Sequence, residues 1–375
     1  MKSLRRSLQS TAKQSSLHEA YRRAVRNKSQ RPEVARFLPQ KVLLLHQITR
    51  SLQTQTYVPS PYYEFTIHDP KTRHILALPI HDRIVHQWVV EEFIKPYYIP
   101  RFIAHTYACI PERGTHQAVA TAQHFLRTAL AHFTSPYIIK LDIASFFSNI
   151  DKAILYQLLA KNIRDRELQA LLFTILFHNT PTQGIPIGNY TSQYFANIYL
   201  NELDQFVKRE LKVKYYVRYM DDFICFVESK NEAGRIYQAI ESFLYTKLHL
   251  PLNPKSRYYP ARHGLDFCGY KIHPHHRRLR NRSKRKLCEI IDEYENGMDS
   301  LERFELRVNS WLGHAAHADA HTYTRRKLAR YQEKFPKKKK KKQSLRVSEI
   351  RLPKRDCRID MFILPLSKRE KRTSL

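Results

Sequence analysis

The 375-residue sequence has no apolar run that approaches the roughly 20 residues needed for a membrane-spanning helix. Its basic N-terminus is not followed by an apolar segment and a small-residue cleavage site, so we expect neither a membrane contact nor a secretion signal. None of its five cysteines stands in a CxxC pair. This pattern favours a reduced, cytoplasmic protein over a disulfide framework.

Acidic residues are also scarce. The chain holds 34 Asp and Glu against 65 Lys and Arg, which gives a formal charge of +31. Such a charge favours a polyanionic partner, above all nucleic acid. The alternative is a basic protein whose lysine-rich faces are simply solvated. At this length the chain can hold two or three subdomains around a substantial core.

The segment HGLDFCGYKIHPHH (263–276) gathers several histidines and one cysteine. A zinc site is one interpretation, but the paired spacing of zinc ligands is missing. We therefore favour a basic groove wall for this segment.

Hydrophobic periodicity predicts helices that alternate with short buried strands. In chain order we expect a basic helical segment over 1–31, a strand over 74–80, an amphipathic helix over 81–94, a strand ending at Asp142, a helix near Asp151, a glycine loop and long helix over 184–211, a helix over 231–248 and helices over 283–335. The lysine run at 337–342 is of low complexity.

The stretch YVRYMDDFICF (216–226) places Asp221 and Asp222 inside an apolar, aromatic pattern that predicts a strand, a tight turn and a strand. Adjacent half-buried carboxylates repel one another and lose hydration unless a cation lies between them. An ordinary turn containing aspartate is the alternative. The strand that ends at Asp142, followed by the glycine loop and its helix, favours the cation.

Nucleotidyl transfer uses two Mg²⁺ ions about 4 Å apart, and such hard cations take oxygen ligands. We expect Asp142 to supply a bridging carboxylate, Asp221 a second carboxylate and Ile143 a backbone carbonyl. Asp222 would be a supporting ligand. Mn²⁺ is the expected substitute ion.

Several consecutive stretches resemble the motifs of the reverse transcriptase family. They are PKTRHILALPIHDRIVHQ (70–87), YACIPERGTHQAV (107–119), KLDIASFFSNID (140–151), GIPIGNYTSQYFANIYLNELD (184–204), YVRYMDDF (216–223), LPLNPKS (250–256) and GLDFCGYKI (264–272). The resemblance spans residues 20–325 and implies an RNA-directed DNA polymerase with an α+β right-hand fold. That fold has a palm with an antiparallel sheet backed by helices, and a helical thumb.

The resemblance also implies a domain order. The expected domains are a basic N-terminal helical arm (1–31), fingers with part of the palm (32–134), a palm with the catalytic carboxylates and primer grip (135–275), a helical thumb (276–335) and a Lys-rich C-terminal tail that we expect to be mobile (336–375).

The glycine loop departs from most of the family, which has Pro-Gln-Gly followed three residues later by Ser-Pro. Here the chain has Pro186-Ile187-Gly188 and then Ser192-Gln193. This form resembles the reverse transcriptases of diversity-generating retroelements, which copy a template-repeat RNA with errors at adenines for diversification of a target gene. A Gln side chain can form hydrogen bonds to the incoming nucleotide, whereas Ile187 can only contact it through its apolar surface. Apolar contact distinguishes a correct from an incorrect substrate by only about 1–3 kcal/mol. We therefore expect low fidelity, with simple packing of Ile187 as the alternative.

Two further interpretations stay open. One is another prokaryotic reverse transcriptase of ordinary fidelity, of the retron, abortive-infection or intron type. The loop argues against the intron type, as does the lack of a sizeable region after the expected thumb. The other is a non-catalytic RNA-binding scaffold, which the three retained aspartates disfavour.

The resemblance implies roles for individual residues. Phe147 matches the position whose ring excludes a 2′-hydroxyl, so dNTPs are the expected substrates and an RNA-dependent RNA polymerase is disfavoured. Lys255 is the expected general acid, although the family usually places its Lys one position later. The expected nucleotide-binding residues are Lys71, Arg73, Phe147, Ile187, Gly188, Asn189 and Gln193. The expected nucleic-acid-binding residues are Arg83, Arg113, Lys271, Arg277, Arg278, Arg280, His314 and His317, the two histidines sharing one helix face with His321.

The expected partners follow from the same resemblance. They are template RNA, the duplex of primer and cDNA, dNTPs and a small basic accessory protein that helps to bind the template. The sequence itself shows no surface for the accessory protein.

Overall fold

The computed structural model describes residues 3–28, 30–68 and 72–334, with side chains as far as residue 329. The chain divides into two compact units, Met1–His276 and Arg277–Leu375. The junction expected between palm and thumb, after residue 275, lies one residue from this division. Lys71 and the expected tail at 336–375 lie outside the described residues.

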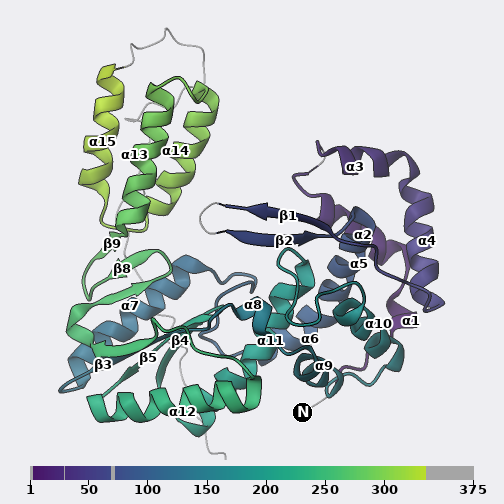
Figure 1. Cartoon of the computed structure of the whole chain (residues 1–375), viewed down its shortest axis with the longest axis horizontal. Coiled ribbons are helices and arrows are strands. Elements are labelled where there is room, and N and C mark those ends of the chain that lie inside the picture. Colours follow the sequence, from purple (N-terminus) through teal and green to yellow (C-terminus); the bar gives the residue numbers. More distant parts are fainter. Residues whose placement is uncertain (1–2, 29, 69–71, 335–375) are drawn as a thin grey trace, which may run out of the picture. The chain divides into compact units, whose positions relative to one another are not determined.

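The first unit mixes helices and strands (Figure 1). Its helices are α1 (Leu8–Thr11), α2 (Gln14–Val25), α3 (Pro32–Phe37), η1 (Leu38–Gln40), α4 (Lys41–Gln53), α5 (Ile80–Val89), η2 (Val90–Ile94), α6 (Lys95–Tyr98), η3 (Ile99–Arg101), α7 (Thr115–His132), α8 (Phe146–Asn149), α9 (Lys152–Ala160), α10 (Arg166–Phe177), α11 (Tyr190–Gln205), η4 (Phe206–Glu210), α12 (Lys230–Leu248) and η5 (Ala261–His263). Its strands are β1 (Tyr63–Ile67), β2 (Arg73–Ala77), β3 (Tyr137–Asp142), β4 (Tyr215–Tyr219), β5 (Asp222–Val227), β6 (Arg257–Pro260), β7 (Leu265–Phe267) and β8 (Tyr270–Ile272). The α+β class predicted from the sequence is confirmed.

A four-stranded antiparallel sheet, in the order β4-β5-β3-β6, forms the centre of the first unit. The predicted strand, turn and strand are confirmed as β4 and β5, which Met220 and Asp221 connect. Asp222 is not part of the turn but begins β5, where it lies opposite Asp142 of β3. The register of the sheet therefore brings two of the sequence's candidate ligands together.

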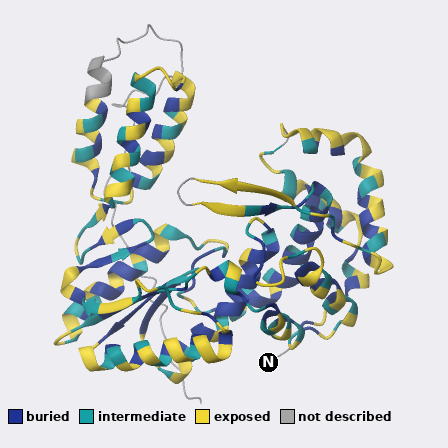
Figure 2. Ribbon diagram, in the orientation of Figure 1, coloured by how far each residue is buried: buried dark blue, intermediate teal, exposed yellow. Residues whose placement is uncertain are grey.

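Both faces of this sheet are covered, and the buried residues concentrate there (Figure 2). Alternate side chains of a strand point to opposite faces. Ile139 belongs to the main apolar cluster, together with Ile240 of α12. On the other face Tyr215 meets Phe125 of α7, with ring centroids 5.2 Å apart. Because both faces of the sheet are covered, the sequences of its central strands are continuously apolar and do not alternate between apolar and polar residues.

The N-terminal segment is helical, as predicted, but it packs into the first unit instead of forming a separate arm. Leu8 and Leu17 are buried, and α2 packs against α4 and α5. Trp88 Nε1 of α5 donates to Ser16 Oγ of α2 at 3.0 Å. Part of the segment's positive charge is used within the protein, because Arg23 forms an ion pair with Glu91 at 2.8 Å.

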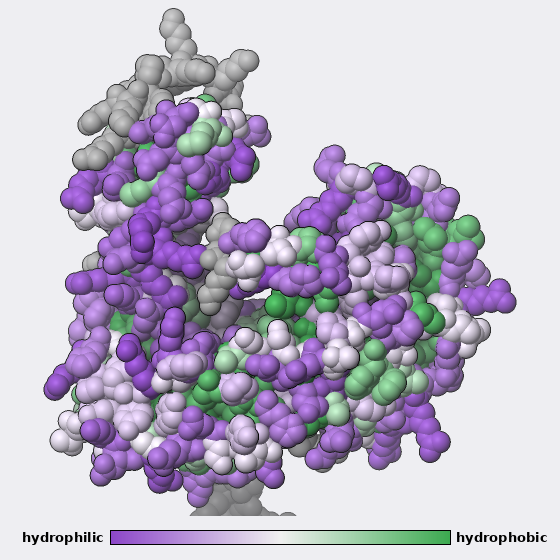
Figure 3. Space-filling model, in the orientation of Figure 1, coloured by the Kyte–Doolittle hydropathy of each residue, from purple (hydrophilic) through white to green (hydrophobic). Residues whose placement is uncertain are grey.

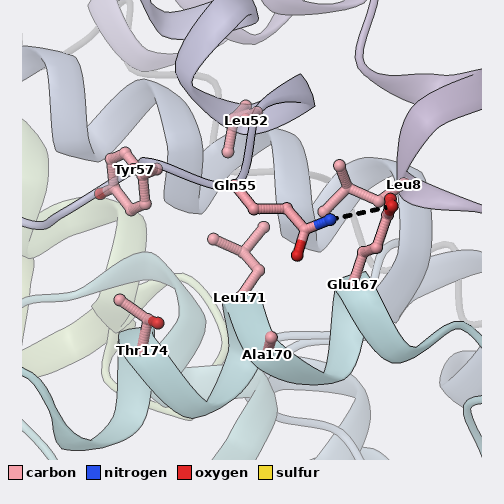
Figure 4. A pocket seen from close by; sticks show the side chains of 8 residues that line it. All are labelled: Leu8, Leu52, Gln55, Tyr57, Glu167, Ala170, Leu171 and Thr174. Carbon is pink, nitrogen blue, oxygen red and sulfur yellow. Dashed lines mark hydrogen bonds between the residues drawn. The ribbon is translucent and has the colours of Figure 1, made fainter.

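A small cavity of about 80 Å³ lies where α1, α4 and α10 meet (Figure 4). Its lining consists of Leu8, Leu52, Gln55, Tyr57, Glu167, Ala170, Leu171 and Thr174. Gln55 Nε2 donates to Glu167 Oε1 at 2.9 Å within this lining. Ligand pockets usually measure about 300–1,000 Å³. This cavity is therefore a packing gap and not a nucleotide site.

The second unit begins with β9 (Arg277–Leu279) and continues as α13 (Asn281–Glu295), α14 (Leu301–Ala315) and α15 (His321–Lys334). Trp311 of α14 donates to the carbonyl of Ser283 in α13 at 2.7 Å. The helices predicted over 283–335 are confirmed up to residue 334. Within the described ranges no helix is both long and apolar enough to cross a membrane.

The packing of the N-terminal segment gives a stability prediction. Leu17→Ala should lower the free energy of unfolding by about 2–5 kcal/mol, because a buried leucine leaves a cavity when truncated. Arg22→Ala is the matched control on the same helix, since that side chain is 69% exposed, and it should change the free energy by less than about 0.5 kcal/mol. Urea denaturation measures both. Equal, small effects would mean that this segment is not part of the core.

Candidate active site

Two carboxylates meet at one end of the central sheet. Asp142 ends β3, Asp222 begins β5, and the two residues are register partners. Residues directly opposite in an antiparallel pair have Cβ atoms about 4.5–5.5 Å apart and share a face, so one ion can reach both side chains. Asp221 follows in the adjoining turn, and all three aspartates are half-buried.

Lys140 adds positive charge beside these carboxylates. Its Nζ lies 3.9 Å from Asp222 Oδ2, and it also donates to the carbonyl of Asp266. Across the described ranges, no group of three or more His, Cys, Asp or Glu side chains is already gathered as a metal site. The donor set still suits Mg²⁺, because carboxylate oxygens on adjacent strands are hard ligands.

A fully buried arginine holds the turn that carries Asp221. Arg218 of β4 donates from Nη1 to the Met220 carbonyl at 3.0 Å. Met220 has a φ of 56°, a left-handed conformation that non-glycine residues adopt only when their surroundings hold them. Arg218 Nε and Nη2 donate to the two carboxylate oxygens of Asp204 at 2.7 and 2.6 Å. This bidentate pair fixes the guanidinium plane and, through it, the turn.

The ion pair is satisfied on every side. Asp204 also accepts from the Tyr216 hydroxyl and from Thr106 Oγ1, each at 2.8 Å, and Arg218 Nη1 also donates to Asn197 Oδ1 at 3.0 Å. Burial alone would lower the pKa of Arg218, but the Asp204 carboxylate offsets it and the pKa is raised. Arg218 therefore stays charged, as a buried charge can when hydrogen bonds satisfy its remaining groups.

The glycine loop before α11 links the palm side of the unit to the β1–β2 hairpin. The Ile185 N–H donates to the carbonyl of Phe147 at 2.8 Å, which ties one end of the loop to α8. The Leu76 N–H of β2 donates to the carbonyl of Ile187 at 3.3 Å, which ties the other end to the hairpin. The loop thus lies between the residue expected to select the sugar and the strand that bears Arg73.

Two glycines make this close approach possible. Gly184 has a φ of 75°, and a Cβ there would lie 2.6 Å from the carbonyl oxygen of Phe147. Gly188 has a φ of 123°, and a Cβ there would lie 3.1 Å from the carbonyl oxygen of Leu76. Ile187 between them is half-buried. Side chains at either glycine would push the loop away from its two supports.

The first turn of α11 differs from expectation. Asn189 is 6% exposed, and its Nδ2 donates to the Tyr62 hydroxyl at 2.7 Å. It therefore supports the loop from inside instead of lining its nucleotide side, and its side chain does not cap the helix. Gln193 is exposed and accepts a hydrogen bond from Cys109 Sγ at 3.4 Å.

The arginines near the hairpin divide into two groups. Arg73 is exposed on β2, which leaves it available to a ligand. Arg83 forms an ion pair with Glu33, and Arg113 donates to two backbone carbonyls in the turn at 103–106. Arg83 and Arg113 therefore brace the fold, a role that the sequence did not predict.

The remaining candidates lie on later elements. Lys255 is exposed in the loop that precedes β6, and Lys271 is exposed on β8. The candidates in the second unit are Arg277, Arg278, Arg280, His314 and His317.

The three thumb histidines do not share one helix face. His314 is in α14, His317 is in the turn that follows, and His321 begins α15. Burial lowers the pKa of both His314 and His317. They contribute little positive charge toward a phosphate at neutral pH.

Sequence reasoning missed the residues that hold the site together. The position of Arg218 could have revealed its role, because a charged residue inside a strand predicted to be buried needs a partner of opposite charge. Asp204, at the end of a long helix, gave no comparable signal. Asn253 and Ser256 both contact Asp142. They belong to the LPLNPKS motif (250–256), in which only Lys255 was named as a candidate.

Comparison with known protein families gives the deciding observation. Residues 68–272, more than half of the chain, match the family model described as "Reverse transcriptase (RNA-dependent DNA polymerase)". The matched stretch includes the three aspartates, the glycine loop and the Arg218 network. The chain belongs to the reverse transcriptase family. The right-hand polymerase fold expected from the sequence is confirmed by this match, with the β3–β6 sheet as its palm.

Curated relatives of this chain are distant, and each match covers only part of both proteins. The group II intron-encoded protein LtrA of Lactococcus lactis subsp. cremoris is 29% identical over 182 residues, which cover 46% of this chain and 29% of LtrA. The retron Ec83 reverse transcriptase of Escherichia coli is 25% identical over 137 residues, which cover 34% of this chain and 44% of that protein. The chain thus spans less than half the length of either relative.

A solved structure of telomerase from Candida Tropicalis, in complex with a TWJ fragment of telomeric RNA, is also similar. It is 12% identical with a TM-score of 0.48, and the match covers 76% of this chain and 58% of that one.

Hydrophilic side chains cover most of the visible surface of the reverse transcriptase (Figure 3). A smaller hydrophobic patch lies over α4, where Val42 and Leu43 are exposed. A hydrophilic surface on a chain with a formal charge of +31 suits a polyanionic partner better than an apolar one.

The buried network gives a prediction about the palm. Asp204→Asn should lower the free energy of unfolding by about 3–5 kcal/mol, because it leaves the Arg218 charge buried without its partner. Glu19→Gln, which breaks an exposed pair with Arg22 and Arg23, should cost less than about 1 kcal/mol. Chemical denaturation of both variants tests the difference. A cost for Asp204→Asn no larger than that of the surface variant would show that the network is dispensable.

Proposed function

We propose that this chain is an RNA-directed DNA polymerase whose active centre contains Asp142, Asp221 and Asp222. The observation that carries the proposal is the register pairing of Asp142 with Asp222, inside a domain of the reverse transcriptase family. Asp221 stands beside this pair on a turn that Arg218 holds. A polymerase needs carboxylates fixed in this way, because its chemistry depends mainly on positioning and charge stabilisation.

Asp142, Asp221 and the carbonyl of Ile143 would hold two Mg²⁺ ions, or Mn²⁺ as a substitute, with Asp222 in support. When bound, such ions activate the primer 3′-hydroxyl and neutralise charge on the triphosphate. The protein contributes oxygen ligands that are already oriented. Lys255, exposed on the loop next to Asp142, would protonate the departing pyrophosphate.

The sugar and triphosphate would lie between α8 and the β1–β2 hairpin. Phe147 packs edge-on against buried Phe146, with ring centroids 5.4 Å apart, and this rigid placement supports its proposed exclusion of a 2′-hydroxyl. Arg73 would hold the triphosphate, as would Lys71. Gly188 and Gln193 would line the nucleotide side of the loop.

We infer further that this polymerase is error-prone at template adenines, as in diversity-generating retroelements. Ile187 stands where most of the family has Gln, and its side chain can offer no hydrogen bond to an incoming pair. Its carbonyl is already engaged by Leu76. The similarity to intron and retron proteins supports the second candidate, a reverse transcriptase of ordinary fidelity, equally well. The spectrum of copying errors separates this candidate from the error-prone one.

Template RNA and the growing duplex would be the main partners. Lys271 and Arg278 are exposed and would contact phosphates, together with Arg277 and Arg280, so we expect binding to weaken steeply with salt. A small basic accessory protein would help to hold the template.

Removal of one carboxylate tests the proposed active centre. Asp221→Asn should lower RNA-templated primer extension by about a thousandfold, since several kcal/mol of transition-state stabilisation depend on the metal ligands. Glu228→Gln, an exposed change at the other end of β5, should extend primers like the unmodified protein. A fully active Asp221→Asn variant would overturn the assignment.

The fidelity proposal has its own test. Ile187→Gln should reduce misincorporation opposite template adenine about tenfold, because the restored amide can form a hydrogen bond worth about 0.5–1.5 kcal/mol. Sequencing of cDNA copied from an adenine-containing RNA measures this error rate. Ile187→Leu keeps an apolar side chain and should leave the errors in place. An unchanged spectrum in Ile187→Gln would defeat the retroelement interpretation while leaving the polymerase itself in place.

A further inference from the structure

The loop between α12 and β6 folds around the end of β3. The Ala144 N–H donates to the carbonyl of Pro251 at 3.0 Å, and the Asn253 N–H donates to the carbonyl of Asp142 at 2.8 Å. This short ladder, with an isolated bridge between Ile143 and Leu252, pairs the chain just after β3 with the loop that precedes β6. It places Asn253 and Ser256 directly beside Asp142.

Ser256 contacts both backbone groups of Asp142. Its Oγ accepts a hydrogen bond from the Asp142 N–H at 3.1 Å and donates to the Asp142 carbonyl at 3.2 Å. A hydroxyl can play both parts at once because it has one donor and two acceptor positions. The backbone of Asp142 is therefore fixed by this loop as well as by the sheet.

Asn253 contacts the side chain of the same residue. Its Nδ2 donates to Asp142 Oδ2 at 2.9 Å, and its Oδ1 accepts from the Lys255 N–H at 3.0 Å. The chemistry of the two partners fixes the orientation of this amide. If it were flipped, its oxygen would face a carboxylate oxygen and its NH₂ would face an N–H donor.

We propose that Asn253 is a positioning residue that orients the Asp142 carboxylate toward the metal and sets the backbone of Lys255 relative to it. This rests on the polymerase function proposed above. The amide directs one carboxylate oxygen with a charge-assisted hydrogen bond, yet it adds no positive charge. A lysine or arginine at this position would neutralise the Asp142 carboxylate and compete with the metal.

The neighbouring residue strengthens the arrangement. Pro254 follows Asn253, so its ring fixes one backbone angle and favours an extended conformation for the asparagine. The turn from Asn253 to Lys255 is closed by the side chain itself, as in other turns that begin with asparagine. One side chain thus couples the candidate metal ligand to the candidate general acid.

Mn²⁺ binding to the full-length protein, measured by electron paramagnetic resonance without substrate, tests this proposal. Asn253→Ala should weaken Mn²⁺ binding about 10–100-fold, the usual effect of losing a group that orients a metal ligand. Asn253→Ser keeps an acceptor for the Lys255 N–H but is too short to reach Asp142, so it should weaken binding to the same degree. Asn162→Ala is the matched control, because this residue also uses both ends of its amide, with Leu158 and Tyr97.

Thermal unfolding of the same variants separates positioning from folding. We expect Asn253→Ala and Asn162→Ala to lower the melting temperature by similar amounts, with Mn²⁺ binding weakened only in the former. Unchanged Mn²⁺ binding in both Asn253 variants would overturn the proposal. Weakened Mn²⁺ binding in Asn162→Ala as well would mean that the loss of binding is a general stability effect, and this result would also overturn the proposal.

Primer extension by the unmodified protein keeps the two hypotheses apart. If the unmodified protein extends primers and the Asn253 variants bind Mn²⁺ normally, only the proposed role of Asn253 is wrong. An unmodified protein that folds and binds Mn²⁺ but extends no primer would defeat the polymerase function. Because the Mn²⁺ measurement needs no substrate, it would still decide whether Asn253 orients Asp142.

Discussion

The buried ion pair between Arg218 and Asp204 is the interaction on which the geometry of the site depends. Removing two charges from water is costly, and the cost is offset only when the geometry is good and every remaining donor and acceptor is used. Here the pair is bidentate, and Tyr216, Thr106 and Asn197 complete it. The last guanidinium contact goes to the Met220 carbonyl, so the buried network directly supports the turn that carries Asp221.

The same pair explains how distant segments keep their relative positions. Asp204 lies near the end of α11, and the glycine loop leads into the start of that helix. The loop is tied to α8 at Ile185 and to β2 at Ile187. A rigid helix anchored at one end by a buried ion pair, and at the other by backbone hydrogen bonds, sets the loop relative to the carboxylates. The glycine loop and the turn that carries Asp221 therefore share one framework.

Much of the palm could be predicted from the sequence, because its strands and helices carry strong local patterns. The hairpin around Asp221 and the helix over 231–248 follow from hydrophobic periodicity and turn residues, which act over a few positions. That the strand ending at Asp142 neighbours the hairpin was also expected, but the register that places Asp142 opposite Asp222 came only from the structure. These features are local or follow from sheet geometry.

The parts that could not be predicted depend on partners far apart in the chain. Asn189 was expected to bind the nucleotide, but its amide donates to the Tyr62 hydroxyl, 127 positions away in the chain. The role of Asn253 depends on a residue 111 positions away. A side chain's type gives its hydrogen-bonding capacity, but only the fold shows which partner uses it.

The central claim is that the paired aspartates form the active centre of an RNA-directed DNA polymerase. The most direct measurement is primer extension by the purified full-length protein on a defined RNA template, with Mg²⁺ and either dNTPs or ribonucleotides. The account predicts cDNA synthesis with dNTPs, none with ribonucleotides and none when Mg²⁺ is chelated. A folded protein that binds the primed RNA but adds no deoxynucleotide in Mg²⁺ or Mn²⁺ would contradict it.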